Sequence, residues 1–484
     1  MVSILAGFST PLVVDLDGTL IKNDLLFETA NNFIIRHPFQ TARLIGWLAS
    51  GKSVLKARLA ESCDIDPNSL LYNEVLIAWL REQKEQGRRL VLATASHRRL
   101  ADAVARHLGL FDEVLATEGE INLKSLHKRD RLVNRYGERG FDYVGNDAAD
   151  LAVWQSADRA YLVSAPRALV AKVRAQGLTV RVFDDCRPSG FISFIKALRL
   201  HQSMKNVLIL VPLFAAHRYG DEASLIQALV AFAVFVLTAS SVYLLNDLID
   251  VADDRHHPRK RRRPFAAGNL SLMHGWLAWP ALLIPAFFTA WLFLPPAFLA
   301  SLGVYFVLTL AYSLYLKQLA IVDVLTLACL YTLRIIAGAT AIAVQLSFWL
   351  LTFSMFVFLS LALIKRFSEL KAARGQGESG QILGRGYFPD DLEMISSLGA
   401  GAGYIAVLVL VLYIQDSHTA DLYQNPHLIW LACPLLLYWI SRIWLITHRG
   451  EMHDDPIVFA LKDRSSWIVG ICFIAIFWLA RVMG

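Results

Sequence analysis

Residues 246–254 read Asn-Asp-Leu-Ile-Asp-Val-Ala-Asp-Asp and directly follow a long apolar run. An ionised aspartate at bilayer depth costs roughly 2.5–3.5 kcal/mol on insertion scales, so three of them at the end of a membrane span need a function. On one continuous helix Asp247, Asp250 and Asp254 fall within about 60° of one another. Like charges at this spacing repel unless a cation lies between them. The pattern predicts a Mg²⁺ site for a diphosphate, with Asn246 as a further oxygen ligand and Asp247 and Asp250 as catalytic residues.

A basic run comes immediately after these carboxylates. It consists of Arg255, Arg259, Lys260, Arg261, Arg262 and Arg263. Metal-binding carboxylates beside such cations predict a site for a phosphorylated substrate, with Lys260 and Arg263 among its ligands. The alternative is that single basic residues here serve only as signals of membrane topology.

The composition divides the chain near Gly190. Of 484 residues 55% are apolar, yet the first 190 resemble a soluble protein. We therefore expect a soluble domain at 1–185, a linker with an interfacial helix at 186–203, and a membrane domain at 204–484. The five cysteines are scattered, which argues against a disulfide framework or a zinc site. The net charge of +6 lies mostly in loops between apolar runs, which favours membrane orientation and phosphate binding over nucleic acid.

The membrane domain is predicted to be all-α and polytopic, with about nine transmembrane helices. The apolar runs lie at roughly 204–219, 223–246, 271–293, 296–316, 319–343, 347–365, 393–415, 427–446 and 466–483. Residues 190–202 are short and amphipathic, so we expect them to lie along the interface. Lys and Arg concentrate in alternate connections, which predicts that these loops and the soluble domain face the cytoplasm at the cell (inner) membrane.

Further charged residues fall near the ends of the spans, and Arg334 lies inside the fifth span. We expect these residues to bind substrate, the cations through its phosphates: Lys205, Lys317, Arg334, Lys365, Arg366 and Glu369. For Arg334 the alternative is an internal ion pair with a neighbouring helix. Lys365 and Arg366 could instead be charges that only stop translocation.

The soluble half begins with Pro11–Leu20, which reads PLVVDLDGTL. A short apolar strand delivers Asp15 at its carboxyl end, where ligand sites of α/β folds form. Asp17 lies two residues on, so one carboxylate can act as nucleophile while the other handles a proton. A second buried strand at 89–93 leads to Thr94, and a third to the acidic loop 145–150. This order predicts an α/β (Rossmannoid) domain with a helical cap at about 22–87.

The soluble half resembles the haloacid dehalogenase superfamily over about residues 10–185. The resemblance implies that Asp15 is the nucleophile, Asp17 the general acid and base, and that Thr94 and Lys128 hold the phosphoryl group. Lys124 competes with Lys128 for that role. Asp150 would bind Mg²⁺ with Asp15 and Asp17, although Asn146 stands where an aspartate is commonest. The apolar cap stretch 33–48 is expected to pack within the cap; the alternative is contact with the membrane or a lipid tail.

The membrane half resembles the UbiA superfamily of intramembrane prenyltransferases, most specifically over NDLIDVADDRHHPRKRRRPFAAG at 246–268. Ordinary members carry a second Asp-rich motif after the sixth span, where this chain has KRFSE at 365–369. KNVLIL at 205–210, YSLYLK at 312–317 and KRFSEL at 365–370 are similar to the decaprenyl-phosphate phosphoribosyltransferase branch. That resemblance implies transfer of 5-phosphoribose from phosphoribosyl diphosphate to polyprenyl phosphate in the bilayer, with Mg²⁺ as cofactor.

The two resemblances together suggest consecutive reactions. The transferase product would still carry a 5-phosphate, and we expect the soluble domain to remove it. One alternative is a prenyltransferase that attaches a polyprenyl chain to an aromatic or other small acceptor. Another is a membrane scaffold or transporter with a relic phosphatase fold. The oligomeric state does not follow from the sequence.

Overall fold

The computed structural model describes residues 10–118, 123–183, 189–257, 259–377, 380–382, 385–415, 423–452 and 455–482. Contacts divide the chain into two compact units. The first unit contains Met1–Ala197 together with Leu244–Ala278, and the second contains Leu198–Tyr243 and Trp279–Gly484. The Asp-rich motif therefore belongs to the same unit as the soluble fold.

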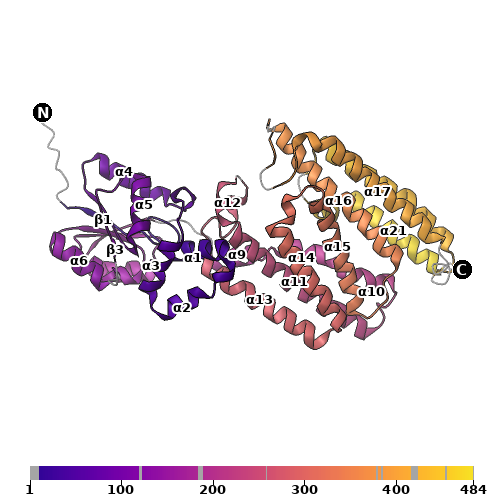
Figure 1. The fold of residues 1–484 in the computed structure, drawn as a ribbon, viewed down its shortest axis with the longest axis horizontal. Coiled ribbons are helices and arrows are strands. Elements are labelled where there is room, and N and C mark those ends of the chain that lie inside the picture. Colours follow the sequence, from indigo (N-terminus) through magenta and orange to yellow (C-terminus); the bar gives the residue numbers. More distant parts are fainter. Residues whose placement is uncertain are drawn as a thin grey trace. The chain divides into compact units, whose positions relative to one another are not determined.

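The first unit is built on a parallel six-stranded sheet with the order β3-β2-β1-β4-β5-β6 (Figure 1). Its strands are β1 (Leu12–Val14), β2 (Leu90–His97), β3 (Glu113–Thr117), β4 (Asp142–Gly145), β5 (Arg159–Val163) and β6 (Thr179–Phe183). Alternate side chains of a strand point to opposite faces, so Leu12 and Val14 pack in one core and Val13 in the other.

Helices cover both faces of this sheet, which confirms the predicted α/β fold. The core around Leu12 includes apolar side chains of α4 (Glu74–Glu85) and α5 (Arg98–Leu108). The core around Val13 includes those of α6 (Leu126–Tyr136), α7 (Leu151–Ser156) and α8 (Arg167–Arg174). The central strands β1 and β4 are buried throughout, as expected of a parallel sheet with helices on both faces, whereas the edge strands β3 and β6 are partly exposed.

The residues between β1 and β2 are mostly helical, as expected of a cap. They form α1 (Leu25–Arg36), η1 (Pro38–Gln40), α2 (Arg43–Ala49), α3 (Lys52–Ser62), η2 (Pro67–Ser69) and α4. α1, α2 and α3 share a small apolar cluster around Phe33, Leu55 and Leu59. α4 lies against the sheet instead, because Leu76, Ile77 and Leu80 are buried in the main core.

The rest of the first unit comes from around the Asp-rich motif. It comprises α9 (Gly190–Ala197), the end of α11 (Glu222–Ile249), α12 (Val251–His256), η5 (Lys260–Arg262) and the start of α13 (Leu272–Phe293). The helix at the motif is not continuous: α11 ends at Ile249, and Asp250 separates it from α12. Hydrogen bonds from the Asp250 amide to the Asn246 carbonyl and from the Asp254 amide to the Asp250 carbonyl still bridge the break.

The second unit is helical. Its remaining elements are η4 (Leu200–Leu210), α10 (Val211–Ala215), α14 (Pro296–Leu314), η6 (Leu316–Gln318), α15 (Val322–Ala341), α16 (Phe348–Gly375), η7 (Pro389–Asp391), α17 (Leu392–Ile414), η8 (Pro426–Leu431), α19 (Ala432–Arg449), α20 (Pro456–Lys462) and α21 (Arg464–Val482). Within the described residues, eight helices are long and apolar enough to cross a membrane: Glu222–Ile249, Leu272–Phe293, Pro296–Leu314, Val322–Ala341, Phe348–Gly375, Pro389–Ile414, Pro426–Arg449 and Arg464–Val482.

The predicted span at 204–219 is corrected by the structure. An eleven-residue 3₁₀ helix, η4, leads there into the five-residue helix α10, and neither has the length of a span. Pro212 lies at the start of α10, where its missing amide hydrogen breaks no helical hydrogen bond. The other eight predicted spans match the eight helices, which makes the chain a multi-pass membrane protein.

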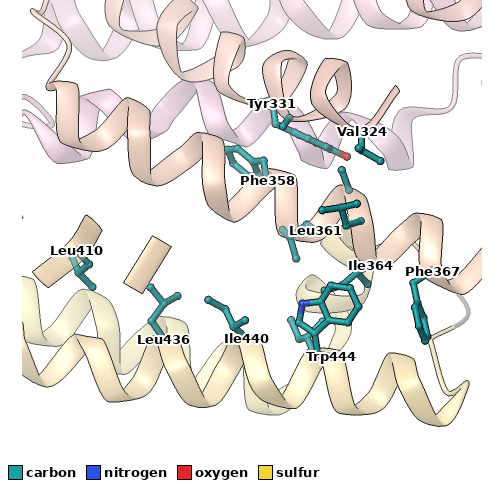
Figure 2. Close-up of a cluster of buried hydrophobic side chains, with 14 of the residues drawn as sticks. Val324, Tyr331, Phe358, Leu361, Ile364, Phe367, Leu410, Leu436, Ile440 and Trp444 are labelled. Atoms are coloured by element: carbon teal, nitrogen blue, oxygen red, sulfur yellow. The ribbon is translucent and has the colours of Figure 1, made fainter. Parts of the chain in front are cut away.

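The core of the second unit lies between α15, α16, α17 and α19 (Figure 2). Small residues let α17 and α19 approach closely, since a Cβ on Gly399 would lie 2.1 Å from the Trp444 ring. The Trp444 indole donates to the Ser360 hydroxyl at 3.1 Å, and that hydroxyl donates to the Gly399 carbonyl at 2.7 Å. In a lipid bilayer the hydrophobic effect does not drive helices together, so close packing and interhelical hydrogen bonds of this kind stabilise their association.

Candidate functional site

A cavity of about 470 Å³ lies where β1, β2 and β4 end. Asp15, Asp17, Lys128, Asn146 and Asp150 are among its lining residues. The carboxyl ends of parallel strands meet at one edge of a sheet, which is why motifs far apart in sequence converge here. The structure thus brings together the residues predicted for the phosphatase site.

Asp15 and Lys128 form a buried ion pair at the cavity. The Lys128 ammonium donates to Asp15 Oδ1 at 2.7 Å and to the Tyr143 hydroxyl at 2.9 Å. Burial raises the pKa of Asp15 to about 7, although Lys128 opposes the shift. Burial would lower the pKa of Lys128, but the carboxylates of Asp15 and Asp150 outweigh it and raise that pKa. Lys128 therefore stays cationic beside the carboxyl that would attack a phosphate.

Lys128, not Lys124, contacts the carboxylates. It lies inside α6, two residues after the helix begins at Leu126. On that helix it reaches Asp15 directly and approaches Asp150 to 3.8 Å. Lys124 also lines the cavity, but it lies ahead of α6 and is exposed.

Asp17 is oriented by neighbours on two elements. Its Oδ1 accepts a hydrogen bond from the Leu25 amide at the start of α1, at 2.8 Å. Its Oδ2 accepts from the Ser96 hydroxyl at 2.6 Å and, at 3.4 Å, from Thr94. The sequence analysis did not assign Ser96. Its position two residues after Thr94 on β2 places both side chains on one face, and this spacing was the available signal.

Asp150 is also engaged by protein groups. Its Oδ1 accepts from the Tyr143 hydroxyl at 2.9 Å, and its Oδ2 accepts from the amides of Asn146 and Asp147 at 3.2 Å. These bonds fix the acidic loop against β4. Gly18 completes the turn: its φ is +73°, and a Cβ there would lie 2.2 Å from the Asn146 side-chain nitrogen. Tyr143 was not assigned from the sequence, since it lies on a strand of otherwise ordinary apolar pattern.

The donor atoms at this cavity fit Mg²⁺. The carboxylates of Asp15 and Asp17 and the amide oxygen of Asn146 are hard oxygen ligands, and all three residues line the same space. A divalent cation there would favour the ionised form of Asp15 despite its burial. Because Asp150 already accepts three hydrogen bonds, its role as a direct ligand remains a prediction.

The cavity extends beyond the catalytic carboxylates to two further sets of residues. Three more lysines line it: Lys22, Lys56 and Lys124. Burial raises the pKa of the neighbouring Asp24 to about 6, while Lys56 and Lys124 oppose the shift. The second set of lining residues comes from the chain just after the Asp-rich motif: Gly268, Asn269, Ser271 and Leu272.

At the Asp-rich motif itself a guanidinium lies between the carboxylates. Arg263 contacts Asp247 Oδ1 at 3.2 Å and Asp254 Oδ2 at 2.6 Å. Both aspartates are buried, whereas Arg263 is partly exposed. The predicted clustering of Asp247 and Asp254 on one side is thus present. The cation that balances them in the structure is an arginine of the basic run.

The motif also offers oxygen ligands that the protein leaves unsatisfied. Asn246 Oδ1 and Asp254 Oδ1 are buried and have no hydrogen-bond partner among the described residues. Such orphan oxygens are costly unless an ion or water satisfies them. They are of the type that Mg²⁺ prefers. In the described part of the chain no three His, Cys, Asp or Glu side chains are already gathered at metal-binding distances.

In the second unit Lys205 and Lys365 share one carboxylate. Asp455 Oδ2 lies 2.7 Å from the Lys205 ammonium and 3.7 Å from that of Lys365. Burial would raise the pKa of Asp455, but the two lysines outweigh it and hold the pKa below its ordinary value. The pair therefore already binds one anionic group. Asp454, considered beside Asp455, lies outside the described residues.

Arg366 and Arg334 are buried in networks of protein groups. Arg366 pairs with Asp323 at 2.8 Å and with Glu369, inside α16 and not at its end. Arg334 donates to the Asn206 side chain, the Leu330 carbonyl and the Tyr305 hydroxyl at 2.6–3.0 Å. These partners are uncharged, so they are not the internal ion pair that the sequence left open for Arg334. Substrate roles for both remain predictions.

Two other predicted basic ligands lie nearer the surface. Lys260 is exposed on η5, and Lys317 is partly buried on η6.

Comparison with known proteins agrees with both halves of this architecture. The pattern of the UbiA prenyltransferase family matches residues 207–467, and that of haloacid dehalogenase-like hydrolases matches residues 12–151. The uncharacterized protein y4nM of Sinorhizobium fredii is 38% identical over 97% of this chain and 91% of its own length. Decaprenyl-phosphate phosphoribosyltransferase of Mycobacterium tuberculosis is 32% identical over 60% of this chain and 94% of its own.

A solved UbiA homolog from Archaeoglobus fulgidus, bound to GPP and Mg²⁺, covers 60% of this chain and 99% of its own, with 17% identity and a TM-score of 0.46. The UbiA match spans more than half of the chain, and the hydrolase match falls on the parallel sheet with its cavity. The chain thus belongs to the UbiA prenyltransferase family, and it carries a haloacid dehalogenase-like hydrolase domain ahead of the membrane helices.

Proposed function

We propose that this chain is a bifunctional membrane enzyme that acts on a polyprenyl phosphate. The membrane half transfers 5-phosphoribose from phosphoribosyl diphosphate to the lipid phosphate and releases pyrophosphate. The hydrolase domain then removes the 5-phosphate and leaves polyprenyl-phosphoryl ribose. The name of the Mycobacterium tuberculosis relative, which this chain matches over 94% of that protein's length, supports the first step. The basic loops support placing both sites at the cytoplasmic face of the cell membrane.

In the transfer step, an oxygen of the lipid phosphate forms a bond to ribose C1. The bond from C1 to the diphosphate oxygen breaks, and pyrophosphate leaves with the electron pair. The acceptor is already anionic at neutral pH, so no general base is required. Asn246, Asp247, Asp250 and Asp254 would hold Mg²⁺, which supplies charge neutralisation for the leaving pyrophosphate.

Cations of the chain would hold the remaining phosphates. Arg263 already lies against two carboxylates of the motif and can turn to a phosphate when the metal takes its place. Lys205 and Lys365 would exchange Asp455 for a substrate phosphate, since they already share one anionic group. The pair Arg366–Glu369 stands where ordinary family members have a second Asp-rich motif, which disfavours a prenyl diphosphate as donor.

In the hydrolytic step, the Asp15 carboxylate attacks the phosphorus of the 5-phosphate. The bond from phosphorus to the ribose O5 breaks, and Asp17 donates the proton that O5 takes up. Water then attacks the aspartyl phosphate, Asp17 accepts the proton of that water, and inorganic phosphate leaves. Lys128 balances the charge beside Asp15, and Ser96 with the Leu25 amide holds Asp17 in place.

One observation carries the link between the two steps. The cavity around Asp15 is lined by Gly268, Asn269, Ser271 and Leu272, which lie just past the Asp-rich motif in the region that matches the UbiA family. A phosphatase that acts on a free metabolite would not require residues of a membrane transferase to line its cavity. A lipid product held near the motif would meet this cavity at high effective concentration.

The test compares the full-length protein with its Asp15→Asn variant. Each is incubated in membranes with Mg²⁺, polyprenyl phosphate and radiolabelled phosphoribosyl diphosphate, and the lipids are separated by charge. The wild type should accumulate the dephosphorylated lipid and the variant the 5-phosphorylated lipid. Equal product ratios in the two proteins would overturn the second step. Transfer from a prenyl diphosphate, without any transfer of ribose, would overturn the first.

A further inference from the structure

The cap of the hydrolase domain carries a long segment without acidic residues. From Thr29 to Ala60 the sequence contains no Asp or Glu, while five cations occur in it: Arg36, Arg43, Lys52, Lys56 and Arg58. α4, which follows in the chain, has the opposite character, with Glu74, Glu82 and Glu85. The stretch from the end of α1 through α2 into α3 therefore carries net positive charge.

The same segment exposes large apolar side chains. Phe39 is fully exposed, Ile45 is 74% exposed and Leu48 is 52% exposed. The opposite face of α2 is used for packing, since Leu44 and Trp47 lie against the cap cluster. Both faces of this short helix are thus apolar, although only one is covered within the described residues. Exposed large apolar side chains close in sequence to exposed Lys and Arg are typical of a segment that contacts an anionic membrane.

Hydrogen bonds join the cap to residues at the ends of two membrane spans. The Asn31 side chain donates to the Leu248 carbonyl at 3.1 Å, and its oxygen accepts from the Trp276 indole at 2.9 Å. Leu248 lies in the last turn of the span Glu222–Ile249, and Trp276 lies near the start of the span Leu272–Phe293. The helix that leads into the exposed segment therefore contacts two span ends at once.

An ion pair strengthens this attachment. Arg255 follows the Asp-rich motif and pairs with Glu28 of α1 at 2.6 Å, with both side chains buried, and it donates to the Ser69 carbonyl at 2.8 Å. Gly268 also packs closely, because a Cβ there would lie 3.0 Å from the Leu71 side chain. The cap and the span ends are therefore parts of one packed structure.

The hydrolase cavity is also lined by residues from a span end. Its wall includes Leu272, the first residue of a span, and Ser271 and Asn269 just before it. A phosphate group in this cavity would thus lie near the ends of the spans, where lipid headgroups are found. A substrate that diffuses in the cytosol would gain nothing from such a position.

We propose that the face formed by Phe39, Ile45 and Leu48, with the exposed cations Arg36, Arg43 and Lys52 of the same segment, inserts into the headgroup layer of an anionic bilayer. This contact rests on the proposed function and narrows its substrate to a phosphate monoester on a membrane-held lipid. The apolar side chains enter the interface, and the cations bind lipid phosphates. The cavity then opens to lipid headgroups.

The first experiment measures the contact without measuring activity. The photo-crosslinking residue benzoylphenylalanine replaces Phe39 in the full-length protein, which is reconstituted into vesicles with about one-third phosphatidylglycerol and irradiated. The matched control carries the same residue at Val75, which is 61% exposed on the acidic helix α4. Lipid adducts at position 39 and not at 75 support the proposal. Adducts with a second protein chain, or equal lipid adducts at both positions, overturn it.

The second experiment measures which substrate depends on this face. The triple variant Phe39→Gln, Ile45→Gln, Leu48→Gln is compared with Val75→Gln in the same vesicles. Hydrolysis of vesicle-borne polyprenyl-phosphoryl 5-phosphoribose should fall at least five-fold in the triple variant relative to hydrolysis of soluble p-nitrophenyl phosphate. An unchanged ratio overturns the proposal. If the wild type hydrolyses neither substrate, the proposed phosphatase function fails, while the crosslinks still decide the membrane contact.

Discussion

Two acidic sites in the first unit are balanced in different ways. In the hydrolase cavity Lys128 pairs with Asp15, and both side chains line a space of about 470 Å³. At the Asp-rich motif the Arg263 guanidinium lies between Asp247 and Asp254 themselves. The hydrolase site is therefore already arranged for a phosphate. On the proposed function, the motif would have to release Arg263 before a metal and a diphosphate could bind between its aspartates.

We therefore expect the hydrolase cavity to keep its structure when a ligand binds, and the Asp-rich motif to rearrange. Lys128 and Asp15 are buried and held by Tyr143, so the charges keep their positions whether or not substrate is present. Arg263 is partly exposed on a loop after a 3₁₀ turn, where movement disrupts little packing. Binding at the motif should consequently change its structure, whereas binding at the cavity should not.

The largest effect is expected from Asp250→Ala. This residue lies at the break between α11 and α12 and is central to the predicted metal site. Loss of one carboxylate should lower phosphoribosyl transfer about 10³-fold. Hydrolysis of p-nitrophenyl phosphate by the same preparation serves as the folding control. Undiminished transfer would favour a non-enzymatic role for the motif.

Lys128→Met should lower phosphatase activity about 10²-fold, because Asp15 loses its buried counter-charge and the phosphoryl group loses a donor. Lys172→Met on α8 removes an exposed lysine of the same domain and is the matched control. Steady-state hydrolysis of a soluble phosphate ester measures both. Equal rates in the two variants would show that the ion pair with Asp15 has no catalytic role.

The Arg263→Gln variant tests whether Arg263 and a metal compete for the aspartates of the Asp-rich motif. We expect about a ten-fold loss of transfer, since a charged contact with phosphate disappears. Two buried carboxylates also lose their cation, so the apparent melting temperature without metal should fall by roughly 3–6 °C. Added Mg²⁺ should then stabilise the variant more than the wild type. The same Mg²⁺-induced shift in both proteins would contradict competition between arginine and metal.

The smallest effect concerns the attachment of the cap. Glu28→Gln and Arg255→Met should each reduce hydrolysis of the lipid substrate about three-fold, because the wall of the cavity shifts. The double variant should be no worse than either single one, since the two residues act through one contact. Additive losses in this double-mutant cycle would argue that the pair does not join the cap to the motif.

Local patterns were sufficient to predict much of the fold. The strand Leu12–Val14 and eight of the spans follow from runs of apolar residues, and the pairing of Asp15 with Lys128 agrees with the resemblance to haloacid dehalogenases, which left Lys124 open as a competitor. η4 was mistaken for part of a span because hydropathy does not distinguish a 3₁₀ segment from an α-helix.

The missed features depend on contacts between distant residues. The break at Asp250 and the position of Arg263 between two aspartates could not be read from a helical wheel that assumes one straight helix. The packing of residues 244–278 against the cap is set by pairs such as Glu28–Arg255, which are 227 positions apart. No local pattern specifies such a pair, so the shared wall of the cavity emerged only from the structure.

The central claim is that the Asp-rich motif binds the diphosphate of the donor through a divalent metal. A cryo-electron microscopy map of the full-length Asp15→Asn protein with Mg²⁺ and phosphoribosyl diphosphate tests it most directly. We predict density for a metal and a diphosphate against Asn246, Asp247 and Asp254, with Arg263 withdrawn from the aspartates. A map in which Arg263 still bridges Asp247 and Asp254 while the donor is bound elsewhere would contradict the account.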